Sequence, residues 1–486
     1  DPDVIRVEDT YYMVSTTMHF MPGCEILQSF DLVHWEHVTY VYETLDHTDA
    51  QQLKSGQNIY GQGMWAASLR YHEGRFCICF VANDTRKTYL YTSEKIDGPW
   101  KKQLIEGFYH DGSLLFDEDG RNYIVYGNDE IWITELNEDL TAPKKDGLHR
   151  LLVSDHKNPE LGYEGSHIQK INGYYYIFLI HSLRDRWMRT EACFYSDSLE
   201  GEFTGGDVLC DDRGYCGQGV AQGGIVDTPD GKWYAMLFQD SGAVGRIPIL
   251  LPVTWKDHFP FFGQNGHVPE EIEVHSTRPG YIYQPLVGSD DFCNGLLPRW
   301  QFNHDPDPRY YHLDALQGTY TITTREVCTE LTQAVNTLTQ RMSYPSCAAE
   351  VTVDASALKE GDVAGLCALQ SCYAAVGITK HHGKYEVLML DKKEDGILDM
   401  TEGTVVESHQ MDFRLEADFC NMKDEARCYY RVNKGDWLPI GTVHKLYFKL
   451  DHFTGCRFGL FCYAAEETGG SACFRDFKYY DVDEIS

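Results

Sequence analysis

A hairpin motif recurs five times in the first part of this 486-residue chain, and this recurrence predicts an all-β protein that begins with a five-bladed β-propeller. Each copy alternates apolar and polar residues with the period of a β-strand, and helical periodicity is nearly absent. After the last copy a second set of short alternating strands predicts a β-sandwich. Because the chain is too long for one ordinary core, we assign residues 1–285 to the propeller and 286–486 to the sandwich.

The five copies begin at equivalent residues, which we call the heads. The copies are "DPDVIRVEDTYYMV", "WAASLRYHEGRFCICF", "DGSLLFDEDGRNYIVYG", "EGSHIQKINGYYYIFL" and "QGGIVDTPDGKWYAML", with heads Asp1, Trp65, Asp111, Glu164 and Gln222. Each copy has an alternating strand, a short polar turn and a second strand that opens with aromatic residues, which is typical of a β-hairpin. A glycine follows nine residues after four of the heads, at Gly74, Gly120, Gly173 and Gly231, whereas the first copy has Asp9 near that place.

Five copies at intervals of about 45 to 65 residues suit blades of four strands each. In such a ring the innermost strands run along a central channel, so the five heads are expected to face one another. Three of the heads are acids: Asp1, Asp111 and Glu164. The sequence therefore predicts a cluster of carboxylates at the axis, with acids on a merely wet channel lining as the alternative.

Carboxylates placed on either side of a sugar can hydrolyse a glycosidic bond, because one protonates the leaving oxygen and another activates water or attacks the anomeric carbon. A third carboxylate can raise the pKa of the acid, since like charges in a confined site do not all ionise. Trp65 can stack on the apolar face of a sugar, and Gln222 can hydrogen-bond to hydroxyl groups. The alternative for Trp65 is a core aromatic residue.

Taken together, the five motifs resemble glycoside hydrolase family 43, whose members are five-bladed propeller enzymes that include β-xylosidases and α-L-arabinofuranosidases. The resemblance implies inversion of configuration in one displacement. It also implies that Asp1 is the general base, Glu164 in "EGSH" the general acid and Asp111 in "DGSLLF" the carboxylate that tunes and orients Glu164.

Three further substrate-binding residues follow from the same resemblance. Arg246 in "VGRIPILLPVTW" matches a sugar-contacting arginine, with a structural ion pair inside its blade as the alternative. Phe20 in "HFMPG" stands where an aromatic residue often forms a pocket wall. His167 is either a pocket residue or a core histidine. Many relatives carry a histidine near a central calcium or water site where this chain has Gln222, so we predict no metal ligands and no required cofactor, and a structural calcium ion stays an open alternative.

The second domain shows the strand segments "TYTITT", "AAEVTV", "YEVLML", "FRLEADF" and "RFGLFCY". It is similar to the concanavalin-like C-terminal domain of xylosidase-type members of the same family. A Pro- and Gly-bearing stretch between Gly263 and Gly288 is expected to be a surface linker. We expect the sandwich to support the propeller and close one side of its pocket, which would make the enzyme exo-acting; direct binding of polysaccharide by the sandwich is the alternative.

Composition limits the partners and the compartment. The formal net charge of −32 disfavours nucleic acid and anionic membranes and suits a small neutral oligosaccharide. No apolar run is long enough for a membrane span. The 16 cysteines are scattered, with Cys77 and Cys79 on one strand face, so we expect free buried thiols and a cytoplasmic location. Native residues are expected to precede Asp1, and a homo-oligomer is left open.

The predicted function is that of an exo-acting inverting glycoside hydrolase that removes terminal β-D-xylose or α-L-arabinofuranose from hemicellulose-derived oligosaccharides. The alternative from another class is a non-catalytic carbohydrate-binding propeller. A sialidase-like propeller is disfavoured, because "SFDLVHW" lacks the glycine of an Asp-box and the net charge does not suit an anionic sugar.

Overall fold

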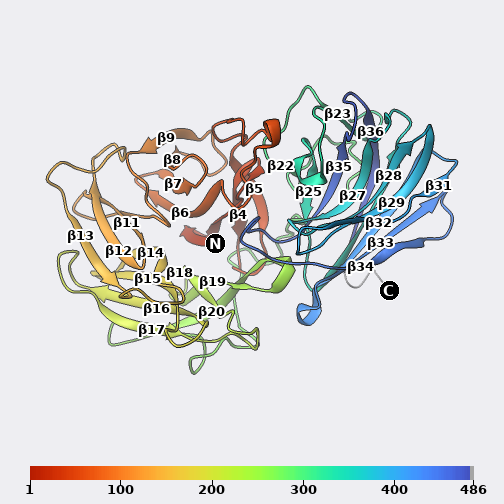
Figure 1. Ribbon diagram of the computed structural model, residues 1–486. Helices are drawn as coiled ribbons and strands as arrows, with labels where there is room; N and C mark the ends of the chain where they lie inside the picture. Colours follow the sequence, from red (N-terminus) through yellow and green to blue (C-terminus); the bar gives the residue numbers. More distant parts are fainter. Residues whose placement is uncertain (482–486) are drawn as a thin grey trace.

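The computed structural model describes residues 1–481, and they form two all-β bodies side by side (Figure 1). The helical elements in this part of the chain are four short 3-10 turns: η1 (Lys54–Gly56), η2 (Gly242–Val244), η3 (Leu331–Gln333) and η4 (Cys420–Met422). Within residues 1–481 no helix has the length and apolar character needed to cross a membrane. The predicted all-β class is therefore confirmed.

The first body is a ring of five four-stranded antiparallel sheets, and the predicted five-bladed propeller is confirmed. Blade 1 consists of β1 (Asp3–Val7), β2 (Thr10–Ser15), β4 (Gly23–Ser29) and β5 (Glu36–Tyr42). Blade 2 consists of β6 (Met64–His72), β7 (Arg75–Ala82), β8 (Lys87–Ser93) and β9 (Lys101–Ile105). Blade 3 consists of β10 (Ser113–Phe116), β11 (Asn122–Asn128), β12 (Glu130–Leu136) and β13 (His149–Ser154). Blade 4 consists of β14 (Glu164–Ile171), β15 (Tyr174–Ser182), β16 (Arg189–Ser196) and β17 (Thr204–Leu209). Blade 5 consists of β18 (Ala221–Asp227), β19 (Trp233–Asp240), β20 (Arg246–Lys256) and β21 (Phe259–Phe262).

The hairpin turns explain the repeated glycine. Gly74, Gly120, Gly173 and Gly231 all have φ between 79° and 84°, in the left-handed region where a residue without Cβ is not strained. In the first blade Glu8 takes the left-handed conformation instead, with φ of 56°. The irregularity that the first copy shows in the sequence is thus a different residue in an equivalent turn.

Each neighbouring pair of blades shares an apolar core. One core joins blades 1 and 2, and three more follow around the ring to blade 5. A fifth core, which includes Val4 of β1 and Tyr234 of β19, joins blade 5 back to blade 1. An ion pair between Arg6 and Asp227 crosses the same seam. Since every blade is a continuous chain segment, side-chain packing rather than strand exchange closes the ring.

The second body is a sandwich of two large sheets, as predicted. One sheet contains β3 (Phe20–Met21), β22 (Gln301–Asn303), β25 (Leu338–Arg341), β35 (Arg457–Tyr463), β27 (Val363–Leu369), β28 (Ala374–His381), β29 (Lys384–Lys392), β30 (Leu398–Met400) and β31 (Thr404–Val406). The other contains β23 (Tyr311–Asp314), β24 (Thr319–Thr323), β36 (Ser471–Asp481), β26 (Ser346–Asp354), β32 (Gln410–Asp418), β33 (Glu425–Val432) and β34 (Leu438–Lys445). The inner faces of both sheets supply the largest apolar core of the molecule.

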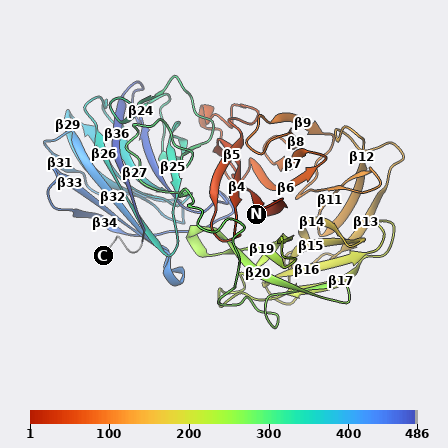
Figure 2. The ribbon, with the colours of Figure 1, turned by 180° about the vertical axis from the view of Figure 1, so that it is seen from behind.

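The propeller contributes a strand to the sandwich. The short β3, which lies between β2 and β4 in the chain, pairs with β22 at the edge of the sandwich sheet. Phe20 of β3 is only 2% exposed, and the guanidinium of Arg457 from β35 lies 3.7 Å from its ring centroid. The two bodies therefore meet along blade 1, with the N-terminus near the middle of the ring in both views (Figure 2).

The segment between β21 and β22 contains no strand and is fastened to blade 1. Tyr281 donates a hydrogen bond to the carboxylate of Glu36, and the backbone N–H of Phe30 donates to the hydroxyl of Tyr283 at 2.8 Å. This packing agrees with a linker that runs along the propeller surface.

Cysteine placement follows the expectation from composition. All 16 cysteines are free, and most of them are buried, including Cys77 and Cys79 on β7. Burial raises the pKa of the Cys79 thiol to about 12, which keeps it protonated and unreactive near neutral pH.

Candidate active site

Two of the three acidic heads lie together. Glu164 is the first residue of β14, and Asp111 precedes β10 by two residues in a left-handed conformation with φ of 46°. The backbone N–H of Gly165 donates to Oδ2 of Asp111 at 3.1 Å. This hydrogen bond ties the head of blade 4 to the head of blade 3, so the two carboxyl groups are neighbours.

A histidine that the sequence did not reveal completes this pair. Nε2 of His110 lies 3.5 Å from Oδ2 of Asp111 and 3.5 Å from Oε2 of Glu164. Asn128 at the end of β11 donates to the same oxygen of Glu164 at 2.6 Å. Neither residue occupies a head position of the repeat, which is why the alignment of the five copies missed both.

Burial and neighbouring charges both shift the pKa values of Asp111 and His110. Burial raises the pKa of Asp111, and the nearby Glu164 carboxylate adds to this rise, while His110 and the N–H of Gly165 counteract it. Burial disfavours the charged form of His110, but the carboxylates of Asp111 and Glu164 outweigh burial and raise the pKa of His110 to about 9. The imidazole is therefore positively charged at neutral pH.

The third acidic head, Asp1, is held by blades 1 and 5. Thr16 donates from Oγ1 to Oδ2 of Asp1 at 2.9 Å, and Arg246 at the start of β20 forms an ion pair with the same carboxylate. Nε of Arg246 also donates to Asp240 at 3.1 Å. Burial raises the pKa of Asp111, and the charge of Arg246 counteracts part of this rise, so Asp1 and the Asp111 pair belong to one electrostatic environment.

Asp240 fixes the orientation of Arg246. Its carboxylate forms ion pairs with Arg246 and with Arg189 of the neighbouring blade. Burial alone would raise the pKa of Asp240, but the two guanidinium groups outweigh burial and lower it. Arg246 thus forms two ion pairs. The pair with Asp240 lies inside its own blade, as the alternative to sugar binding required, and the pair with Asp1 reaches the candidate base.

A cavity of about 550 Å³ lies beside Asp1 and is lined from both bodies. Asp1, Thr16 and Arg246 line it from the propeller, and Phe448 and Phe453 line it from the loop between β34 and β35. The ring of Phe453 lies 5.4 Å from that of Trp65, and the guanidinium of Arg246 lies 4.7 Å from the ring of Phe453. A loop of the sandwich therefore forms one wall of the cavity.

Trp65 and Gln222, two of the predicted substrate-binding residues, lie near the Asp111–Glu164 pair. Trp65 at the start of β6 lies 5.8 Å from the ring of His110, between the carboxylate pair and Phe453. Gln222 is buried, its backbone N–H donates to Glu191 at 2.7 Å, and its side chain packs against Gly165, directly after Glu164. Gln222 therefore lies next to the candidate acid.

His167 and Phe20 are held mainly by structural contacts. Nδ1 of His167 lies 3.1 Å from Oδ1 of the fully buried Asp3, which also pairs with Arg70. This agrees with the alternative of a core histidine. Phe20 borders the cavity, but most of its surface is covered by Arg457 and the sandwich core.

The donor atoms do not match a calcium site. Among residues 1–481, His110, Asp111 and Glu164 form the group of candidate ligands whose atoms lie within 4.8 Å of one another. Calcium prefers six to eight oxygen ligands, and this set offers one imidazole and two carboxylates, one of which accepts a hydrogen bond from Asn128. We therefore assign no step of the chemistry to a metal.

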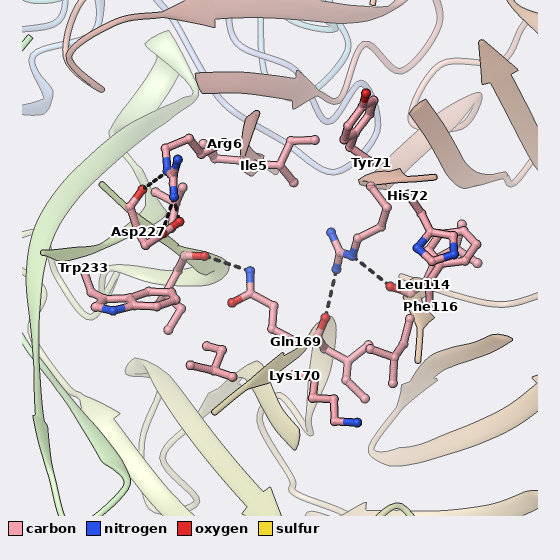
Figure 3. Close-up of a pocket in the computed structure, with 17 residues that line it drawn as sticks. Ile5, Arg6, Tyr71, His72, Leu114, Phe116, Gln169, Lys170, Asp227 and Trp233 are labelled. Carbon is pink, nitrogen blue, oxygen red and sulfur yellow. Dashed lines mark hydrogen bonds and ion pairs between the residues drawn. The ribbon is translucent and has the colours of Figure 1, made fainter. Parts of the chain in front are cut away.

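A second cavity, of about 400 Å³, lies at the opposite ends of the same innermost strands (Figure 3). Its charged groups are paired with the protein itself: Arg6 with Asp227, and Arg70 with Asp3 and the carbonyl oxygens of Leu114 and Ile168. The three acidic heads do not line it. The three predicted acids thus lie away from this second cavity.

Comparison with family models finds two matches, one in the propeller and one in the sandwich. The model "Glycosyl hydrolases family 43" matches residues 1–260. The model "Beta xylosidase C-terminal Concanavalin A-like domain" matches residues 289–480.

Related proteins carry the names of two pentosidase activities. A protein of Formosa agariphila named "Beta-xylosidase" is 26% identical over 99% of this chain and 87% of its own length. A "Non-reducing end alpha-L-arabinofuranosidase" of Bacteroides ovatus is 23% identical over 82% of this chain and 78% of its own length.

Among solved structures, a "Bifunctional GH43-CE" protein of Bacteroides eggerthii superposes with a TM-score of 0.92 and 42% identity over 100% of this chain. The match covers 62% of that protein, so this chain corresponds to part of its length. A second family structure, described as displaying both endo-xylanase and exo-arabinofuranosidase activity after active-site engineering, superposes with a TM-score of 0.86 and 27% identity over 99% of this chain and 97% of its own.

Proposed function

Because the chain belongs to glycosyl hydrolase family 43, we propose that it is an exo-acting, inverting enzyme that removes terminal β-D-xylose or α-L-arabinofuranose from hemicellulose-derived oligosaccharides. The chain is a glycoside hydrolase, and the names of its relatives support a pentose at the non-reducing end. The observation that carries the assignment of roles is the hydrogen bond from the N–H of Gly165, the residue after Glu164, to the Asp111 carboxylate, near the Arg246–Asp1 pair.

In this proposal Glu164 protonates the leaving oxygen while Asp1 removes a proton from the attacking water. Thr16 and Arg246 orient the Asp1 carboxylate, and its ionised form suits a general base. Asp111 keeps a second acidic group next to Glu164, which favours the protonated form of one member of the pair. The substrate is a small neutral oligosaccharide, and no cofactor takes part.

Support for exo action comes from the loop that carries Phe448 and Phe453. Together with Asp1 and Arg246 it lines the cavity beside the candidate base, although Asp111 and Glu164 do not line this cavity. In this proposal the loop limits the space beyond the terminal sugar. A digest of linear xylo-oligosaccharides should then release monosaccharide from the first time point. Early release of internal fragments from long xylan would contradict exo action.

A panel of aryl glycosides tests the activity. We expect hydrolysis of aryl β-D-xyloside, aryl α-L-arabinofuranoside or both, and at least a thousandfold loss of kcat in Asp1→Asn, since the base is needed whatever the leaving group. Asp9→Asn is the matched control, because Asp9 lies in an exposed ion pair with Arg278 far from the site. Failure of the wild-type enzyme to cleave either pentoside would refute the proposal.

Proton NMR of the first product tests the stereochemistry. An inverting enzyme releases the anomer opposite to that of the substrate before mutarotation. Release of the same anomer would show that a carboxylate acts as a nucleophile. Binding of xylo-oligosaccharide by calorimetry without any turnover would instead support a non-catalytic propeller.

A further inference from the structure

His110 occupies a position between the two carboxyl groups of the candidate acid site. It belongs to the segment that leads into β10, directly before Asp111, and its Nε2 lies at the same 3.5 Å distance from Asp111 and from Glu164. Its side chain is 21% exposed, and the ring of Trp65 lies 5.8 Å away. Its place therefore puts one imidazole nitrogen within ion-pair distance of two carboxylates that come from different blades.

The charged groups around His110 define its electrostatic balance. Asp111 and Glu164 favour the imidazolium, and Arg86, whose guanidinium stacks 3.8 Å above the ring centroid of Phe108, opposes it. The two carboxylates prevail, and they raise the pKa of His110 to about 9. Arg246 acts on Asp111 from blade 5, and Arg189 lies within electrostatic range of Glu164.

We propose that His110, as an imidazolium, is a positioning residue that bridges Asp111 and Glu164 and sets the upper pH limit at which Glu164 holds the proton for the leaving group. This inference rests on the proposed function, because it needs Glu164 as the general acid. Nothing in the five-copy repeat points to position 110, since it lies one residue before a head.

The sign of the effect follows from counting charges. With His110 charged, Asp111 ionised and Glu164 protonated, the three groups sum to zero, and loss of the Glu164 proton leaves one net negative charge. Without the imidazolium, the same loss would place two anions side by side, which is less favourable. Removing the charge of His110 should therefore move the loss of the Glu164 proton to higher pH.

His110→Gln tests this directly, because glutamine keeps an N–H donor on a side chain of similar length and removes the titratable charge. The assay is kcat/KM against pH on an unactivated xylo- or arabino-oligosaccharide, where acid assistance is needed. We expect the alkaline limb to move up by about one pH unit or more, with KM changed less than twofold. A limb that stays in place, or moves to lower pH, would overturn the proposal.

His72→Gln is the matched control. His72 is the last residue of β6, at the opposite end of the strand from Trp65, and its ring stacks on Phe116. The same exchange of imidazole for amide there should leave the pH profile unchanged. An equal shift in both variants would mean that the change is general, and would also overturn the assignment to His110.

An imidazole NMR titration gives a readout that does not require activity. The His110 signal, identified by its loss in His110→Gln, should titrate at least one pH unit above an ordinary histidine. It should move toward the ordinary range in Glu164→Gln and in Asp111→Asn, because each variant removes one of the two carboxylates. Titration at the ordinary value in the wild-type protein would refute the bridge even if the enzyme hydrolysed no pentoside, so this inference and the proposed function fail separately.

Discussion

Replacing the buried Asp3 with asparagine should destabilise the propeller far more than the loss of an exposed charge does. Asp3 is fully buried at the centre of the ring. Its carboxylate accepts hydrogen bonds from the N–H of Leu69 at 2.7 Å and from Arg70 at 2.8 Å, and it lies 3.1 Å from Nδ1 of His167. One side chain of blade 1 thus holds blades 2 and 4.

The expected magnitude follows from what the change leaves behind. Arg70, whose side chain is 12% exposed, also donates to the carbonyl oxygens of Leu114 and Ile168 and to the hydroxyl of Ser113, so it stays largely buried when Asp3 becomes neutral. A buried guanidinium without its carboxylate costs about 3–5 kcal/mol. Asp9→Asn removes the exposed pair with Arg278 and should cost at most about 1 kcal/mol.

Urea unfolding followed by tryptophan fluorescence, for wild type, Asp3→Asn and Asp9→Asn, measures the difference. Arg70 and His167 outweigh burial and hold the pKa of Asp3 below its usual value, so the stabilisation is present above about pH 4 and is lost as the pH falls further. The difference in free energy of unfolding between wild type and Asp3→Asn should therefore become smaller at acidic pH. Equal costs for the two variants at neutral pH would refute the role of Asp3.

Three further outcomes follow from the site and its surroundings. Glu164→Gln should lose turnover on oligosaccharides yet retain part of it on aryl glycosides with good leaving groups, as steady-state kinetics would show; normal oligosaccharide turnover would exclude Glu164 as the acid. Phe453 lines the cavity beside Asp1, so Phe453→Ala should lose about 1 kcal/mol of contact with the sugar and raise KM about fivefold, with a smaller effect on kcat; an unchanged KM would contradict a substrate-facing wall. Glu191 is buried, and burial raises its pKa well above the usual value, so wild-type stability should fall as the pH rises above about 4.3. Glu191→Gln should flatten the dependence of Tm on pH; the same slope of Tm against pH in wild type and variant would contradict a protonated Glu191.

Repetition in the sequence was sufficient for the fold and for the places of the heads. Alternating strands with a glycine at a constant offset can form only similar hairpins, and the left-handed φ of Gly74 and its counterparts is the backbone reason for that constancy. The strand segments of the second domain were equally predictable, because β-sandwich strands alternate in the same way. The roles of Asp1, Asp111 and Glu164 stay predictions until the variants are measured.

The tertiary structure decided what surrounds those heads. His110 and Asn128 reach Glu164 from blade 3, and Phe453 reaches Trp65 from the sandwich, more than 380 residues along the chain. No local pattern encodes these contacts, since each depends on how two separate sheets pack against each other. The repeat alone therefore determines which side chains point to the axis, whereas burial and neighbouring charges, which exist only in the folded ring, determine their protonation.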